Sequence, residues 1–156
     1  MSEKTLHRAV CDYLRLQYPQ VMFNSDLAGA TKLTMGQAVA MKSLRSNRGF
    51  PDLSIYRPKI WIENFETHMY YGLFIELKKE GEKLYKVRTV DAYGNPAFIS
   101  DHVAEQQDCI TRLCNSGYYA CFCIGFDESK KVIDWYLDEI KQLNQIDLNE
   151  VQQKLF

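Results

Sequence analysis

An apolar stretch that ends in two charges, residues 71–78, constrains the fold of this chain more than any other part of its sequence. Its Leu, Phe and Ile residues predict a strand that is buried on both faces. Side chains alternate across a strand, so Glu76 and Lys78 point to the same side with Leu77 between them. Burying these two charges is costly unless ion pairing, a metal or catalysis compensates. The strand therefore predicts a polar site at its end.

A second short apolar run, residues 49–56, has a carboxylate, Asp52, near its start. If the two strands lie side by side, Asp52 comes next to Glu76 and Lys78. Two close carboxylates suit a hard divalent cation such as Mg2+, and the lysine can orient a metal-bound water or stabilise a developing oxyanion. In a simpler interpretation, Asp52 caps a turn while Glu76 and Lys78 merely pair at a strand end. The spacing alone leaves both interpretations open.

Length, charge and hydrophobic content limit the number of domains and the kinds of binding partner that we expect. A chain of 156 residues with 46% hydrophobic content suits one globular domain over residues 1–156. Its 19 Lys and Arg against 20 Asp and Glu give a net charge of −1, so any phosphate contact must come from a local patch. The sequence contains neither a membrane-length apolar run nor a signal-peptide pattern after Met1. We therefore expect a cytoplasmic protein without a membrane partner.

The five cysteines do not predict a disulfide framework, because their number is odd and no Cys-x-x-Cys pair occurs. Zinc binding by the four later cysteines is an alternative to buried free thiols. The thiol interpretation fits the spacing better, since Cys109 and Cys114 match a helix interior and Cys121 and Cys123 alternate with the core residues of a strand.

Hydrophobic periodicity predicts an α/β layered domain, in which a central mixed sheet is flanked by helices. The segment 58–70 fits no single element and either covers or extends the sheet. Residues 79–90 predict a turn followed by a basic, aromatic flap beyond the end of the buried strand. The predicted order is a helix from Ser2 to Tyr18, a strand at 21–23, a loop at 24–34, a helix through 37–44, strands at 53–56 and 73–78, a helix at 101–116, a strand at 118–124 and a helix from 127 to 140.

Two groups of cations flank the predicted site. One group precedes the Gly49 turn and the other belongs to the flap. Each group either contacts a phosphate backbone or is only a solvated face, and the sequence leaves both interpretations open. The first group is Lys42, Arg45 and Arg48, and the second is Lys79, Lys83, Lys86 and Arg88.

Three motifs in order resemble the VRR-NUC branch of the PD-(D/E)xK nucleases. They are residues 48–53 (RGFPDL), residues 72–83 (GLFIELKKEGEK) and the pair Glu105 and Gln106 on the helix that leads to residues 117–120 (GYYA). The resemblance covers roughly residues 3 to 137. It implies a restriction-endonuclease-like core that hydrolyses phosphodiester bonds with a divalent metal.

The same resemblance implies roles for individual residues. Asp52, Glu76 and Leu77 are expected to bind Mg2+ or Mn2+, and Lys78 is expected to act on the attacking water. Gln106 matches the family's helix glutamine near the active site, and Glu3 matches an acidic residue on the first helix.

The resemblance also implies a short, stand-alone member of the family, a kind common in bacteriophages, that cuts DNA in replication, repair or recombination. Without DNA-reading domains it should select DNA by its shape, as in branches and junctions, because phosphate contacts carry no sequence information. One active site cuts one strand, so a homodimer is expected.

Two alternatives come from other classes of function. A non-catalytic nucleic-acid-binding module has no need of the Asp52, Glu76 and Lys78 trio, and an enzyme acting on another phosphorylated substrate would normally show a Gly-rich phosphate loop, which is not visible here.

Overall fold

Four strands form the central sheet of the computed structural model, which describes residues 1–26, 34–36, 40 and 49–138 except for the side chains of residues 63, 87, 88 and 96. The sheet order is β1-β2-β5-β8. The first two pairings are antiparallel and the pairing of β5 with β8 is parallel, so the sheet is mixed as predicted. The strands are β1 (Phe23–Ser25), β2 (Leu53–Ile55), β5 (Leu73–Lys78) and β8 (Tyr119–Ile124).

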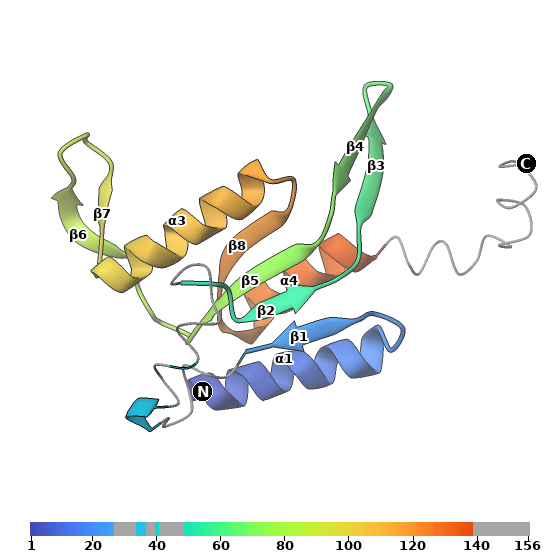
Figure 1. The fold of residues 1–156 in the computed structure, drawn as a ribbon, viewed down its shortest axis with the longest axis horizontal. Helices are drawn as coiled ribbons and strands as arrows, with labels where there is room; N and C mark the ends of the chain where they lie inside the picture. Colours follow the sequence, from blue (N-terminus) through green and yellow to red (C-terminus); the bar gives the residue numbers. More distant parts are fainter. Residues whose placement is uncertain (27–33, 37–39, 41–48, 139–156) are drawn as a thin grey trace, which may run out of the picture.

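Strand β5 is buried along its whole length, as its sequence predicts. Leu73, Ile75 and Leu77 belong to the larger core, which they share with α1 (Glu3–Gln17) and α4 (Gly125–Leu137). Phe74 points the other way and packs against Ile110 of α3 (Asp101–Asn115). Helices therefore cover both faces of the sheet (Figure 1). By alternation, Glu76 and Lys78 lie on the α3 face.

Helices α1 and α3 begin where the sequence predicts, whereas α4 begins at Gly125 rather than at residue 127. The Ser2 hydroxyl accepts a hydrogen bond from the Thr5 N–H at the start of α1, and Ser100 does the same for Val103 at the start of α3. Helix α3 connects β5 to the parallel strand β8, because parallel neighbours need a long crossover connection. This crossover places the first turns of α3 near the carboxyl end of β5.

Strand β1 differs from the prediction. It begins at Phe23 rather than at residue 21 and includes Asn24 and Ser25, which the sequence pattern assigns to a loop. Pairing decides the boundary, because Phe23 pairs with Ile55 and Ser25 pairs with Leu53. Most of the helix predicted through residues 37–44 lies outside the described residues.

Two hairpins project from the body of the molecule (Figure 1). The segment that the sequence left unassigned forms β3 (Lys59–Glu63) and β4 (Glu66–Tyr70), a separate two-stranded sheet. Asn64 and Phe65 both have positive φ in its two-residue turn, an unusual choice of residues for such a turn. The predicted flap is the second hairpin, formed by β6 (Tyr85–Val90) and β7 (Pro96–Phe98).

The prediction of buried thiols is wrong for Cys114, which is exposed on α3 and places its sulfur 3.5 Å from the Ala120 carbonyl oxygen. Cys109 and Cys123 are buried. Among the described residues, no helix is both long and apolar enough to cross a membrane.

Candidate active site

A cleft of about 330 Å³ opens at the carboxyl end of β5. Its walls come from α1, the segment before β2, the end of β5 and the first turns of α3. All the residues that the sequence predicts for catalysis or metal binding line this cleft: Glu3, Asp52, Glu76, Leu77, Lys78 and Gln106.

The pairing of β2 with β5 brings Asp52 to the end of β5. Leu53 is the partner of Ile75 across the two strands, so the residue before Leu53 lies beside the end of β5. There the Leu77 N–H donates a hydrogen bond of 3.0 Å to Asp52 Oδ2. Asp52 thus holds two elements of the fold together, and its charge is near enough to raise the pKa of the Glu76 carboxyl.

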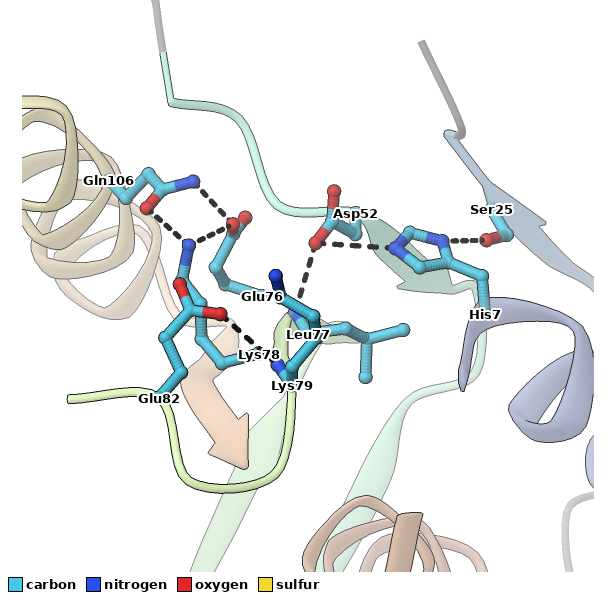
Figure 2. A network of polar contacts seen from close by, with 9 residues as sticks. All are labelled: His7, Ser25, Asp52, Glu76, Leu77, Lys78, Lys79, Glu82 and Gln106. Carbon is cyan, nitrogen blue, oxygen red and sulfur yellow. Dashed lines mark hydrogen bonds and ion pairs between the residues drawn. The ribbon is translucent and has the colours of Figure 1, made fainter. Parts of the chain in front are cut away.

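Glu76, Lys78 and Gln106 form a closed triangle of hydrogen bonds (Figure 2). Lys78 Nζ donates to Glu76 Oε1 at 3.1 Å and to Gln106 Oε1 at 2.8 Å. The Gln106 amide in turn donates to the same Glu76 Oε1. All three residues are buried. The simpler interpretation of the sequence, in which Glu76 and Lys78 pair with each other at the strand end, therefore holds in part, since the two side chains do form an ion pair.

Gly49 lets the Asp52 segment lie directly against α3. Its φ of +72° is unfavourable for other residues, and a Cβ at this position would lie 2.8 Å from both the Cα and the N of Gln106. No other residue type fits so close to helix backbone. Glycine here therefore sets the separation between Asp52 and the Gln106 turn.

Burial and like charge make Glu76 an unusual carboxylate. Desolvation first, and then the neighbouring Asp52 charge, raise the pKa of Glu76 to about 8, although Lys78 pulls it down. Glu76 is only 3% exposed, and its Oε2 has no hydrogen-bond partner among the described residues. A buried carboxylate oxygen without a partner is destabilising by itself, because burial removes its water without replacement.

In both Asp52 and Glu76, one carboxylate oxygen is held by neighbouring protein groups, and the other oxygen takes no part in those contacts. Asp52 Oδ2 faces Leu77 and His7, while Oδ1 points away from them (Figure 2). Glu76 Oε1 is held by Lys78 and Gln106, while Oε2 has no partner in the part of the chain that the structure describes. Two hard oxygen donors beside a raised carboxyl pKa fit a divalent cation such as Mg2+.

The described residues supply these two carboxylates without a third acidic side chain grouped beside them. Among the described residues, no group of three or more His, Cys, Asp and Glu side chains is placed to hold a metal ion. The Leu77 side chain belongs to the core on the far face of β5, so Leu77 can offer only its main-chain carbonyl. The remaining positions therefore suit water or phosphate oxygens, which Mg2+ commonly keeps.

Sequence reasoning missed some residues that line this cleft and a buried one that lies behind it. His7, buried on α1, places its Nε2 3.6 Å from Asp52 Oδ2. It follows Glu3 by four residues, so the helical period that predicted α1 also puts both on one face. Glu82, from the turn after β5, and His102, from the first turn of α3, also line the cleft. No signal in the sequence distinguished these two from surface residues.

The predicted DNA-binding cations remain a prediction. Lys79, Lys83 and Lys86 are exposed on the turn after β5 and on β6. Lys79 borders a separate hollow beside Phe126 of α4, so it faces away from the cleft that Lys78 lines. The side chain of Arg88 lies outside the described part of the chain, as do Lys42, Arg45 and Arg48.

Comparison with known proteins bears on the fold. No family model and no curated protein matches the sequence. A solved structure described as a VRR_NUC domain protein matches with a TM-score of 0.53 and 22% sequence identity, over 88% of this chain and 89% of that chain. The chain thus has a VRR-NUC-like fold, which agrees with a restriction-endonuclease-like core and a central mixed sheet flanked by helices.

Proposed function

We propose that this chain is a metal-dependent endonuclease that hydrolyses phosphodiester bonds in DNA, with Mg2+ as its cofactor and Mn2+ as a substitute. The observation that carries the proposal is the pair of carboxylates, each with one oxygen held by the protein and the other oxygen outside those contacts. Asp52 and Glu76 present this pair beside the ammonium of Lys78. A module that only binds nucleic acid has no need of that combination.

A divalent cation at these oxygens would make a bound water more acidic and neutralise charge that develops on the phosphate. Lys78 has three N–H donors, and two of them are used by Glu76 and Gln106. The third remains for the attacking water or for a phosphate oxygen, where a positive charge stabilises the transition state. Gln106 holds both partners of this ion pair, so its role is to orient Lys78 and Glu76.

We further propose that the substrate is branched or junction DNA met in replication, repair or recombination. The cleft presents carboxylates and one lysine, which suit a phosphodiester and do not read bases. Selection must then depend on the shape of the backbone. Two copies of the chain would supply the two cuts that a junction requires.

A cleavage assay tests this function. Single-stranded, nicked, flap and four-way DNA are incubated with Mg2+, Mn2+, Ca2+ or a chelator, and the Asp52→Asn variant serves as the inactive control. We expect cleavage with Mg2+ and Mn2+, faster on flap or four-way DNA than on linear duplex. Metal-dependent binding of branched DNA without any cleavage would instead identify a binding module. Equal rates on all substrates would overturn the proposed selectivity.

A further inference from the structure

A buried histidine approaches the candidate metal site from behind. His7 lies on the inner face of α1 and is 1% exposed. Its Nδ1 is hydrogen-bonded to the Ser25 hydroxyl at 3.1 Å, and its Nε2 is 3.6 Å from Asp52 Oδ2 without a full hydrogen bond (Figure 2). Three segments far apart in the sequence, α1, β1 and the start of β2, therefore meet at one imidazole ring.

Packing alone does not account for this histidine. Its neighbours on the buried face of α1 are apolar, including Leu6, Val10 and Leu14. A buried imidazole nitrogen without a full hydrogen bond is destabilising, and an apolar residue would avoid that cost. A histidine here is therefore better explained by what it does to Asp52.

The hydrogen bond to Ser25 determines how the ring faces Asp52. When the Ser25 hydroxyl donates to Nδ1, the neutral ring carries its proton on Nε2, and that N–H points at Asp52 Oδ2. The same oxygen already accepts the Leu77 N–H at 3.0 Å. The Leu77 hydrogen bond and the nearby His7 Nε2 both approach Oδ2 and favour one rotation of the carboxylate, in which Oδ1 is directed away from both of them (Figure 2).

We propose that His7 and Ser25 form a positioning pair that orients Asp52 for a divalent cation and so sets the metal affinity of the site. The inference rests on the proposed function in one respect, namely that Asp52 binds the metal. His7 is not itself a metal ligand in this arrangement, because its Nε2 faces the oxygen that Leu77 also holds. Partners that orient metal-binding side chains in this way commonly change metal affinity by about 10- to 100-fold when they are removed.

Metal titration without DNA tests the positioning pair. Calorimetry measures Ca2+ and Mn2+ binding to the wild-type chain and to the His7→Leu, His7→Gln and Ser25→Ala variants. The His68→Leu variant, which makes the same change on the β4 strand, is the matched control. Thermal unfolding of each variant establishes that it is folded.

We expect His7→Leu to lower the affinity for both metals by about 10-fold or more. His7→Gln should retain most of the affinity, because its amide N–H can replace Nε2–H, and Ser25→Ala should lie between Gln and Leu. His68→Leu should bind like the wild type. If His7→Leu does not fold, the Ser25→Ala and His7→Gln variants decide the question.

Unchanged affinity in folded His7→Leu and Ser25→Ala variants would overturn the inference. A much larger loss for Mn2+ than for Ca2+ would also overturn it, because imidazole prefers Mn2+ and the result would make His7 a direct ligand. Cleavage measured in parallel separates the two proposals. His7-dependent metal binding without cleavage removes the nuclease function and keeps the positioning role, whereas a wild-type chain that binds neither metal removes both.

Discussion

Two carboxylates in this molecule, Asp134 and Glu76, lie in polar networks that differ in how many of the carboxylate oxygens are hydrogen-bonded. Asp134 of α4 has both oxygens bonded, since Oδ1 accepts from the Tyr13 and Tyr18 hydroxyls and Oδ2 accepts from Lys130 at 2.7 Å. Glu76 of β5 receives its hydrogen bonds from the described residues on Oε1 only. The first network is complete, and the second leaves a buried carboxylate oxygen, Oε2, without a partner in the described part of the chain.

The pKa values of the two groups diverge accordingly. Burial by itself would raise the pKa of Asp134, but the hydrogen bonds from Lys130, Tyr13 and Tyr18 outweigh burial and lower it. Burial and the nearby Asp52 charge raise the pKa of Glu76 to about 8. The contrast separates a network that joins α1 to α4 from an incomplete network with a raised carboxyl pKa, a combination that is more common at functional sites.

The largest effect is expected at the incomplete network. Asp52→Asn or Glu76→Gln should reduce Mg2+-dependent DNA cleavage by about 1,000-fold or more, since each removes a hard metal ligand and the charge that holds the metal. Neither variant should unfold the chain, because the neutral side chain relieves like-charge repulsion. The Asp12→Asn change at an exposed site of α1 is the control. Wild-type cleavage rates in either site variant would refute the metal assignment.

Lys78→Ala should lower the cleavage rate by about 100- to 1,000-fold while metal titration still detects binding. In the proposed function the ammonium acts on the attacking water or on developing charge, so its loss should change the rate rather than the metal affinity. Lys131→Ala, at an exposed position of α4, controls for the lost charge. If the Lys78 variant no longer binds metal, the lysine is a structural partner of Glu76 instead.

The complete network should show the reverse pattern. Asp134→Ala should lower the free energy of unfolding by about 1–3 kcal/mol, since the buried Tyr18 loses the main acceptor of its hydroxyl. Metal binding should not change. Denaturant unfolding measures the loss, with Lys131→Ala again as the control. A stability loss at Asp134 no larger than that of the control would mean that this network does not hold α1 to α4.

The pH dependence of stability should have opposite signs for the two carboxylates. The pKa of Glu76 is about 8 in the metal-free folded chain, whereas the unfolded chain loses this proton near pH 4.5. The Glu76 contribution to stability therefore falls as pH rises between these values. Because the pKa of Asp134 is lowered in the folded chain, this carboxylate contributes stability that is present above pH 3.8 and is lost as the pH falls below that value.

Comparison of unfolding curves across pH checks both signs. In the Glu76→Gln variant the decline toward pH 8 should disappear, while Asp134→Ala should lose only the acid-side dependence. A decline of the same size in wild type and Glu76→Gln would place the responsible group elsewhere.

The smallest effect concerns the exposed cations of the flap. Replacing Lys83 and Lys86 by Ala should weaken binding to every DNA sequence alike, because these residues are expected to contact phosphates only. The slope of log affinity against log salt should flatten by up to about two units. Binding is measured in Ca2+ over a salt series. A slope that changes instead in the control pair Arg112→Ala and Lys131→Ala would mean that DNA approaches from another side.

The sequence predicted much of the fold because its strongest signals are local. The six-residue buried strand and the capped helices α1 and α3 formed where predicted. The two-stranded sheet of β3 and β4 did not follow from pattern, because its turn uses Asn64 and Phe65 rather than the glycine that usually marks such a turn. The limits of β1 were also missed, since they depend on pairing with β2.

What the sequence by itself determined is the set of chemical groups and the elements that carry them: a buried strand that ends in Glu76 and Lys78, Asp52 ahead of a second strand, and Gln106 early in a helix. Alternation along β5 even placed Glu76 and Lys78 on one face. Only the tertiary structure decided which carboxylate oxygens are held and which are left without a partner. Hydrogen bonds from Leu77, Lys78 and Gln106, together with the close approach of His7, make that choice. They depend on contacts among α1, β2, β5 and α3 that no local pattern records.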